Sequence, residues 1–326
     1  MRESKKDRNM TVSDNITGIA QDVEAVITNY NHGEMLREAI CSVYDQTVRP
    51  AGIIIVDDGS ADEESVRILK EIEEGTGAPV PVHVIWQENC GVSVARNVGI
   101  RNTCSPLVLV LDGDDRLRPT YIEKVGRKLR ESPHLAAASS WMQTFGALTA
   151  AVCPCGGDVA TFLSHNCCPA THIMRRRVWE LCGGYDESMR SGFEDWEFFL
   201  NMLEAAPDTS IGIVEEMLIE YRTASVSANI KSMDKRLEIM RFIIEKHIRT
   251  YQKHIADALL EIEAVSMERL FRWENEILHT LGGEQTISSG GEEFLKHPTY
   301  GDGGMAAAVR IVSQLNTGKD TESEKK

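Results

Sequence analysis

The chain has 326 residues, which is enough for one large domain with an appendage or for two small domains. Its hydrophobic fraction of 42% and its charged fraction of 26% are typical of a soluble globular protein. The formal net charge of −15 argues against a duplex nucleic-acid-binding protein and against a polybasic membrane anchor, because both need a cationic surface.

The first half of the chain alternates strand and helix patterns. A polar leader at 1–22 contains no apolar stretch typical of a signal peptide, and we expect it to be disordered. Strands are predicted at 23–28, 53–56, 82–86 and 107–111, and helices at 34–44, 62–73 and 93–101. Strands that alternate with such helices form βαβ units. The pattern therefore predicts an α/β fold with a doubly wound sheet that binds ligands at the carboxyl ends of its strands.

The second half is less regular. After residue 119 we expect a helix to about 130, a strand to about 141, a loop to 157, another helix, a strand at 171–174 and a helix that ends near 182. Residues 231–281 are almost all helix-forming. An apolar stripe recurs there at helical spacing, through Met240, Ile243, Ile244, Ile248, Tyr251 and Ile255. We expect the first part of the stripe to pack on the core. These helices could also form a homodimer interface, and the sequence does not decide between a dimer and a monomer. Residues 282–304 are glycine-rich and predict a loop.

These patterns divide the chain into a leader at 1–22, an α/β domain at 23–230, a mainly helical extension at 231–315 and a disordered tail at 316–326. The least charged stretch, 135–152, contains several polar residues, whereas a spanning helix needs about 20 mostly apolar ones. We therefore expect no integral membrane span and a cytoplasmic location, with peripheral contact to the inner face of the membrane as a further expectation.

Eight cysteines without a secretory signal predict reduced thiols, not a disulfide framework. Some of them lie close in sequence to one another and to histidines, and such a group could hold zinc: Cys153, Cys155, Cys167, Cys168, His165 and His172. Structural zinc sites usually have CxxC-type spacing, which neither cysteine pair has. We therefore expect buried or loop thiols here.

Polar residues follow three of the predicted strands, at 28–31, 57–60 and 112–115. Asp112 and Asp114, one residue apart after a buried strand, can coordinate Mg²⁺ or Mn²⁺ together with a diphosphate. The alternative is a turn in which aspartates bond their own backbone. The carboxylates at 57–58 can accept hydrogen bonds from a ribose or a base edge, or can form a turn that caps the next helix.

Two further segments hold candidate site residues. In segment 191–196, Ser191 and Glu194 have the spacing of a capping box, and the helix dipole favours an ionised Asp195, as a general base requires. Trp196 is expected in the core in preference to a sugar-stacking position. Segment 91–99 opens a helix, on which Arg96 and Asn97 could face a nucleotide; a solvated arginine is the alternative.

Six segments in order resemble family 2 glycosyltransferases of the GT-A fold: VITNYNHGEMLREAICSVYDQT, IIIVDDGSADEES, NCGVSVARNVGI, LVLVLDGDDRLRP, HIMRRRVWELCGGYDE and GFEDWEFFLNML. The resemblance covers about 23–221. It implies a GT-A type doubly wound mixed sheet flanked by helices, and the C-terminal helical extension lies outside it.

The resemblance implies roles for single residues when the family's motif positions are matched to this sequence. Thr28, Tyr30 and Asp58 correspond to nucleoside-binding residues. Asp112 and Asp114 correspond to the metal-binding pair, with Asp114 the direct ligand and Asp115 assisting, and Asp195 corresponds to the catalytic base. Arg222 lies where many members carry a YRxH segment near the diphosphate; here the run 221–225 has no histidine, which leaves that contact open.

The implied activity is inverting, Mn²⁺- or Mg²⁺-dependent transfer of a sugar from a nucleotide diphosphate sugar, a UDP-sugar first, to a carbohydrate, lipid-linked or protein acceptor. Cell-surface polysaccharide or glycoconjugate synthesis is the expected context. One alternative is a glycosyltransferase-like scaffold or binding module without catalysis. Another is a sugar nucleotidyltransferase, which normally has a basic, glycine-rich loop after its first strand; segment 29–33 has no lysine or arginine.

Overall fold

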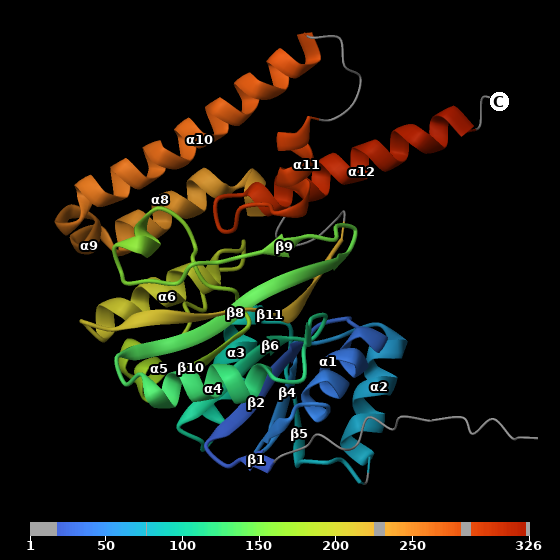
Figure 1. Cartoon of the computed structure of the whole chain (residues 1–326). Helices are drawn as coiled ribbons and strands as arrows, with labels where there is room; N and C mark the ends of the chain where they lie inside the picture. The colour runs from blue at the N-terminus through green and yellow to red at the C-terminus, as the bar shows by residue number, and fades with distance from the viewer. Residues whose placement is uncertain (1–17, 76, 225–231, 282–287, 324–326) are drawn as a thin grey trace, which may run out of the picture.

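The structure is a computed structural model that describes residues 18–75, 77–224, 232–281 and 288–323. Within these residues a nine-stranded sheet has the order β5-β4-β2-β6-β10-β8-β11-β7, and β9 pairs with β8 (Figure 1). Its first half is parallel and consists of β2 (Val23–Asn29), β4 (Ile53–Asp57), β5 (Val82–Trp86) and β6 (Leu107–Asp112). β10 (His172–Arg175) then runs antiparallel to both of its neighbours. The remaining strands are β7 (Arg116–Leu117), β8 (Leu135–Gly146), β9 (Ala151–Val152) and β11 (Ser210–Thr223). The predicted mixed α/β sheet is confirmed.

Helices cover both faces of the sheet, because successive side chains of a strand point to opposite sides. Ala25 and Ile27 of β2 lie in one core cluster and Val26 in the other. The helices of the first cluster are α1 (Glu34–Tyr44), α2 (Glu63–Glu74) and α4 (Tyr121–Glu131). The helices of the second are α3 (Val92–Arg101), α5 (Arg176–Cys182) and α6 (Glu194–Ala205).

Helix α3 approaches the sheet closely at Gly99. A Cβ atom at this position would lie 2.3 Å from Cγ1 of Val26 and 3.2 Å from Cγ2 of Val56, so any larger residue would push the helix away from β2 and β4. The short distance also fixes Arg96, which lies three residues earlier on the same helix face.

The C-terminal extension packs on the core through its first helices. These are α8 (Arg236–Lys246) and α9 (Ile248–Lys253), followed by α10 (Ile255–Leu281), α11 (Ser289–Lys296) and α12 (Gly304–Ser323). Ile243 and Tyr251 are buried in the α6 core cluster, as expected for the first part of the extension. The chain breaks helical continuity at His247 and His254, which changes the phase of the apolar stripe. Ile248 and Ile255 are therefore exposed, so the apolar stripe is not continuous across these helices.

Several segments have more regular structure than the sequence predicted. β1 (Gly18–Ala20) lies in the predicted leader and pairs with β3 (Val48–Pro50). Residues 1–17 of that leader lie outside the described part. A short 3₁₀ turn, η2 (Thr161–Leu163), stands where a helix was expected after 157. Helix α11 occupies part of the predicted loop, and α12 extends through 316–323, for which we predicted a disordered tail. The division of the chain into four parts stays a prediction. None of the described helices is long and apolar enough to cross a membrane.

Candidate active site

The carboxyl ends of β2, β4 and β6 meet at one edge of the sheet. Thr28 pairs in register with Asp112, and its hydroxyl donates to Oδ1 of Asp112 at 3.1 Å. Tyr30 follows β2 and is 46% exposed at this edge. The topology thus brings these three residues together, as the sequence predicts, and their contacts with a nucleoside stay a prediction.

Asp58 is buried and holds the turn before α3. Its carboxylate accepts hydrogen bonds from Nε2 of Gln87 at 2.7 Å and from the backbone N–H groups of Cys90 and Gly91 at 2.8 and 2.9 Å. Helix capping falls to another residue, Asp62, which accepts from the backbone N–H of Ser65. Asp58 therefore orders the turn that leads into α3, and a contact with a nucleoside remains a prediction for it.

Arg96 is buried and bridges two carboxylates from distant parts of the chain. Its Nη2 lies 2.8 and 3.0 Å from the two carboxylate oxygens of Asp112, and its Nη1 lies 2.8 Å from Oε1 of Glu194. Burial alone would lower the pKa of Arg96, but the charges of Asp112 and Glu194 raise it well above its usual value. The solvated-arginine alternative is therefore wrong. Arg96 joins the end of β6 to the start of α6, and its charge is already matched by protein carboxylates.

Asn97 lies in the core and does not face the nucleotide edge. Its Nδ2 donates to the carbonyl of Tyr185 and to Glu187, both at 2.9 Å. Its Oδ1 accepts from the backbone N–H of Tyr185 and from Nε1 of Trp179. All of these partners belong to the segment around α5, so Asn97 fastens that segment to α3. These four contacts use the amide within the protein and argue against its predicted contact with the nucleotide, which stays untested.

The three aspartates after β6 have different environments. Asp112 is held by Arg96, whose charge and hydrogen bonds lower the pKa of this carboxyl against the opposing effect of burial. Asp115 is buried and accepts the backbone N–H of Arg222 at 2.8 Å; burial and the nearby aspartate charges raise its pKa well above the usual value. Among the described residues, the Asp114 carboxylate has no ion-pair partner. It is the carboxylate best placed for a cation.

A divalent cation fits this edge through Asp114 more readily than through Asp112. Magnesium and manganese sites at phosphates commonly use one or two protein carboxylates, and substrate oxygens complete the shell. Both oxygens of Asp112 are occupied by Arg96, which argues against direct ligation by Asp112. Burial raises the pKa of Asp114, with a further contribution from the Asp112 charge, and a cation would offset that cost.

His32 is a site residue that sequence reasoning missed. Its Nδ1 is buried and has no hydrogen-bond partner among the described residues. A Cβ atom at Gly113 would lie 3.0 Å from this nitrogen. The imidazole therefore faces the aspartate segment closely. A single histidine in a loop carries no sequence pattern that would have identified it.

Arg222 lies beside the aspartate segment. Its Nε donates to the carbonyl oxygen of Asp114 at 2.9 Å, and its Nη2 contacts Glu38 at 2.8 Å. The guanidinium also stacks over the ring of Phe145, 4.5 Å from its centroid. These contacts orient Arg222 at the edge that would receive a diphosphate, and whether it contacts one stays a prediction.

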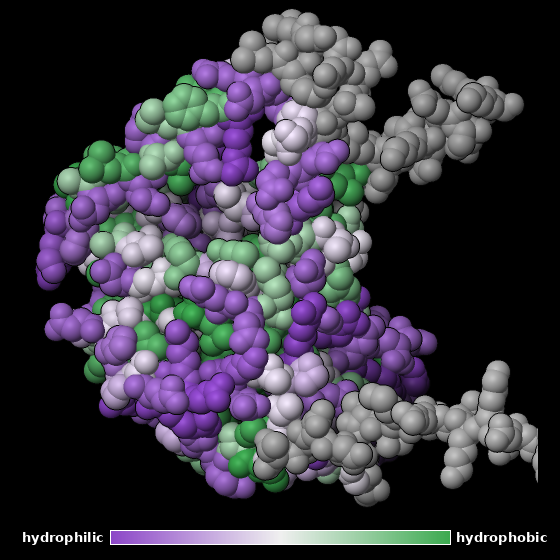
Figure 2. All heavy atoms as spheres, in the orientation of Figure 1, coloured by the Kyte–Doolittle hydropathy of each residue, from purple (hydrophilic) through white to green (hydrophobic). Residues whose placement is uncertain are grey.

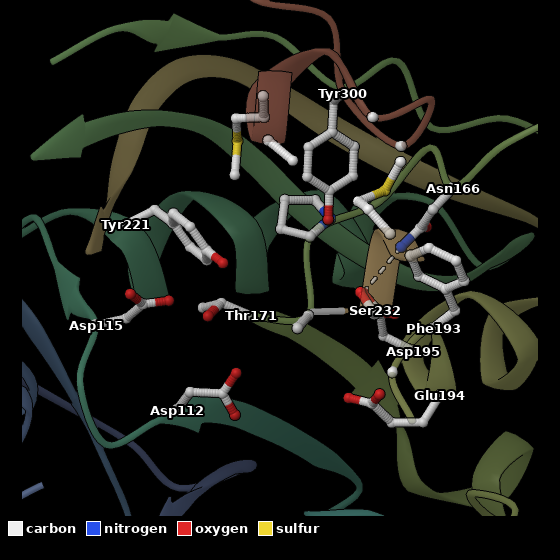
Figure 3. A pocket seen from close by; sticks show the side chains of 18 of the residues that line it. Asp112, Asp115, Asn166, Thr171, Phe193, Glu194, Asp195, Tyr221, Ser232 and Tyr300 are labelled. Carbon is white, nitrogen blue, oxygen red and sulfur yellow. Dashed lines mark hydrogen bonds between the residues drawn. The ribbon is translucent and has the colours of Figure 1, made fainter. Parts of the chain in front are cut away.

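A cavity of about 200 Å³ separates the aspartate segment from the start of α6 (Figure 3). Asp112 and Asp115 lie on one side of it, and Glu194 and Asp195 lie on the other. The C-terminal extension supplies much of the remaining wall, through Ser232, Met233, Arg236, Tyr300, Gly301, Gly303, Met305 and Ala306. The extension is therefore part of the site, although it lies outside the family resemblance.

Asp195 lies in the first turn of α6 and faces this cavity. Its Oδ2 accepts a hydrogen bond from Nδ2 of Asn166 at 2.9 Å, and its Oδ1 accepts the backbone N–H of Trp196 at 2.8 Å. Burial and the adjacent Glu194 charge raise the pKa of Asp195 to about 7. The expectation that the helix dipole keeps this carboxylate fully ionised is wrong, because burial outweighs the dipole. A pKa near neutrality suits a general base.

The predicted capping box does not form. Phe193 occupies the N-cap position of α6 in the left-handed conformation, with φ of 59°, and no side chain caps the helix. Glu194 is directed to Arg96 instead. Trp196 is fully buried and donates to the carbonyl of Phe162, as expected for a core residue.

The sheet order, the helices on both faces and the carboxylates at the strand ends define a fold of the GT-A glycosyltransferase type. The family model for glycosyl transferase family 2 matches residues 24–151. This match confirms, for that region, the resemblance seen in the motifs.

Two curated proteins and one solved structure illustrate the similarity. Glycosyltransferase GlyA of Streptococcus pneumoniae is 34% identical over 122 residues, which cover 37% of this chain and 16% of GlyA. The uncharacterized glycosyltransferase YwdF of Bacillus subtilis is 26% identical over 239 residues, which cover 69% of this chain and 84% of YwdF. The S. aureus TarS 1–349 structure in complex with UDP-GlcNAc matches with a TM-score of 0.52 and 15% identity, over 64% of this chain and 60% of that chain. The match to GlyA and the match to TarS each cover less than two thirds of the other protein.

Proposed function

We propose that this protein transfers a sugar from a nucleotide diphosphate sugar, a UDP-sugar first, to an acceptor hydroxyl. The observation that carries the proposal is the cavity with the Asp112–Asp115 segment on one side and Asp195 on the other. The match of residues 24–151 to the family model for glycosyl transferase family 2 supports it, and so does the likeness in fold to TarS, which was solved with UDP-GlcNAc.

The proposed reaction is a single displacement with inversion. The Asp195 carboxylate takes the proton of the acceptor hydroxyl as its oxygen forms a bond to the anomeric carbon. The bond from that carbon to the diphosphate breaks, and its electron pair goes to the leaving phosphate oxygen. Asn166 holds Oδ2 of Asp195 and thereby orients the carboxylate. Asp114 would hold Mg²⁺ or Mn²⁺, which when bound supplies positive charge to the diphosphate.

We further propose that the C-terminal extension selects the acceptor. Tyr300 and Met305 line the same cavity as Asp195, which an acceptor must enter. A saccharide acceptor in cell-surface polysaccharide or glycoconjugate synthesis is our first candidate, whether free, lipid-linked or attached to protein. A cytoplasmic location is part of the proposal, and a lipid-linked acceptor would bring the protein to the inner face of the membrane.

The function is tested by donor hydrolysis without acceptor. Purified full-length protein is incubated with a panel of UDP- and GDP-sugars in Mn²⁺, Mg²⁺ or EDTA, and release of the nucleoside diphosphate is measured. We expect metal-dependent release from one donor. No release from any donor would argue for the non-catalytic scaffold, and pyrophosphate-dependent formation of a nucleoside triphosphate would indicate a nucleotidyltransferase.

The pH dependence of turnover reports on Asp195. The carboxyl must be deprotonated to accept a proton, and its pKa is about 7. We therefore expect kcat/KM to rise with pH up to about 7 and to level off above it. A carboxylate with its ordinary pKa would already be ionised at mildly acidic pH. A flat profile from weakly acidic to weakly basic pH would contradict the assignment.

We also propose that α10 mediates a homodimer. It exposes large apolar side chains, including Leu259, Leu260, Phe271 and Trp273, which are 54–70% exposed (Figure 2). The net charge of −15 favours a second protein copy over an anionic lipid surface. Sedimentation velocity should show a dimer that L260E/F271E converts to monomer. The control L237E, at an exposed position of α8, should leave the dimer unchanged. A monomeric wild-type protein would refute the interface.

A further inference from the structure

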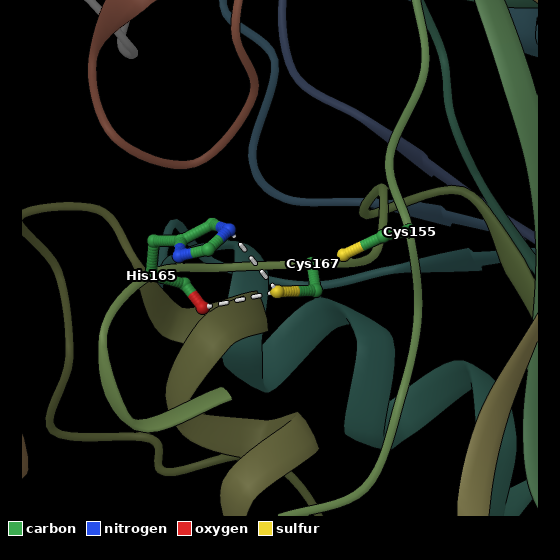
Figure 4. A group of neighbouring side chains, drawn as sticks. All are labelled: Cys155, His165 and Cys167. Atoms are coloured by element: carbon green, nitrogen blue, oxygen red, sulfur yellow. Dashed lines mark hydrogen bonds between the residues drawn. The ribbon is translucent and has the colours of Figure 1, made fainter. Parts of the chain in front are cut away.

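Three metal-ligating side chains from the loop between β9 and β10 converge beside the active site (Figure 4). Cys155 comes before the η2 turn, and His165 and Cys167 come after it. The two Sγ atoms and the imidazole nitrogen all lie within 4.8 Å of one another. Cys167 is buried, His165 is half-buried and Cys155 is exposed, so the group is open to solvent on one side.

The geometry within the group suits a tetrahedral metal ion. Nε2 of His165 lies 3.4 Å from Sγ of Cys167. With bonds of about 2.3 Å to sulfur and 2.0–2.1 Å to nitrogen, two ligands of tetrahedral zinc lie about 3.6 Å apart. The other ring nitrogen, Nδ1, lies 2.8 Å from the hydroxyl of Ser164. Such a contact fixes the ring of a metal-bound histidine and leaves Nε2 for the ion.

Cys168 and His172 do not join this group. Sγ of Cys168 is buried against the carbonyl of Pro169. His172 is buried against Phe198 and Phe199, with Nδ1 at the carbonyl of Ala170. The thiols at 155 and 167 therefore meet through the loop fold, without the CxxC spacing that the sequence analysis required.

Room for a fourth ligand lies next to the group. A cavity of about 340 Å³ is lined by Cys155, His165 and Cys167 together with side chains of the C-terminal extension. Those side chains include Glu261 and Glu268 of α10, and His297 and Asp302 before α12. A water molecule in this cavity can complete a shell of four.

We propose that Cys155, His165 and Cys167 bind a thiophilic divalent cation, zinc first, which clamps the 155–167 loop next to the active site. Asn166 stands between two of the ligands, and its side chain holds Asp195. The loop before α12 closes over the same place, because a Cβ atom at Gly301 would lie 2.0 Å from the carbonyl oxygen of Asn166. The metal thus acts as a positioning element for Asn166, a part of the inference that rests on the proposed function.

Metal content tests the site without any activity assay. Full-length protein purified under reducing conditions is analysed by plasma mass spectrometry, and cobalt-substituted protein is examined for thiolate-to-cobalt absorption. We expect about one zinc per chain in the wild type, at least tenfold less in C155S/C167S and H165N, and no loss in C104S, a change of an exposed cysteine elsewhere. The cobalt spectrum of the wild type tests thiolate ligation even if the variants fail to fold.

Two results would overturn the inference. One is wild-type protein that carries no more zinc than C155S/C167S and gives no thiolate–cobalt band. The other is a Cys155–Cys167 disulfide found by peptide mapping of freshly purified protein. The positioning role is read separately: zinc removal should shift the pH profile of donor hydrolysis, and zinc return should restore it. Zinc without donor hydrolysis would refute only the proposed function, and donor hydrolysis without zinc would refute only the metal clamp.

Discussion

Replacing Asp195 by asparagine lowers turnover by about 10²–10⁴-fold, the usual contribution of a positioned general base. Asparagine keeps the shape of the side chain and can still accept the hydrogen bond from Asn166, but it cannot take the acceptor proton. Asp195 faces the cavity across from the aspartate segment, so donor binding should be unchanged. The measurement is acceptor turnover, or donor hydrolysis, alongside calorimetric titration with UDP.

The stability of this variant provides an internal control. Because the pKa of Asp195 is raised to about 7 in the folded protein, the folded state binds more protons than the unfolded state above about pH 4. The charged form of Asp195 therefore costs stability progressively as pH rises through that window. D195N should be as stable as the wild type at acidic pH and more stable at weakly basic pH. Wild-type activity in D195N would contradict the base assignment, and D208N, at an exposed position, should match the wild type.

Replacing Asp114 by alanine abolishes metal-dependent donor binding. A metal ion on a diphosphate is worth several kcal/mol of charge stabilisation. Within the described part of the chain, Asp114 forms no ion pair with an arginine, whereas Asp112 is paired with Arg96. We expect the affinity for UDP in Mn²⁺ to fall to the value measured in EDTA. Titration calorimetry with UDP in Mn²⁺ and in EDTA measures the two affinities.

Unfolding should not explain that loss. Burial raises the pKa of Asp114, so its ionised form costs stability as pH rises, and alanine removes a charge close to Asp112 and Asp115. D114A should therefore unfold at the same temperature as the wild type or higher at neutral pH. It should also retain zinc at Cys155 and Cys167, which separates the two proposed metal sites in a way that EDTA does not. Metal-dependent UDP binding that survives in D114A would contradict the assignment.

The strand ends of the parallel half could be predicted because their signals are local. Each strand there is a short apolar run, and the residues that follow it, such as Thr28, Asp58 and Asp112, must lie at one edge once the sheet is parallel. No distant contact is needed for that inference. The pattern of segment 191–196 likewise placed Asp195 at the start of a helix. That pattern does not reveal the burial that raises the pKa of Asp195.

The errors arose where tertiary contacts decide a side chain's partner. Asn97 and Arg96 are adjacent on α3, yet one fastens the α5 segment and the other bridges Asp112 and Glu194. The capping box failed because Phe193 enters the helix with a positive φ and Glu194 has a stronger partner in Arg96. The role of Asn166 depends on how its loop folds, and no spacing rule reveals it.

Binding of UDP and GDP to the full-length wild-type protein, measured by titration calorimetry in Mn²⁺ and in EDTA, tests the central claim most directly. The site predicts binding of one of the two nucleotides, UDP first, that weakens at least tenfold when the metal is removed. No binding of either nucleotide in the presence of Mn²⁺ or Mg²⁺ would contradict a donor site at the Asp112–Asp115 edge.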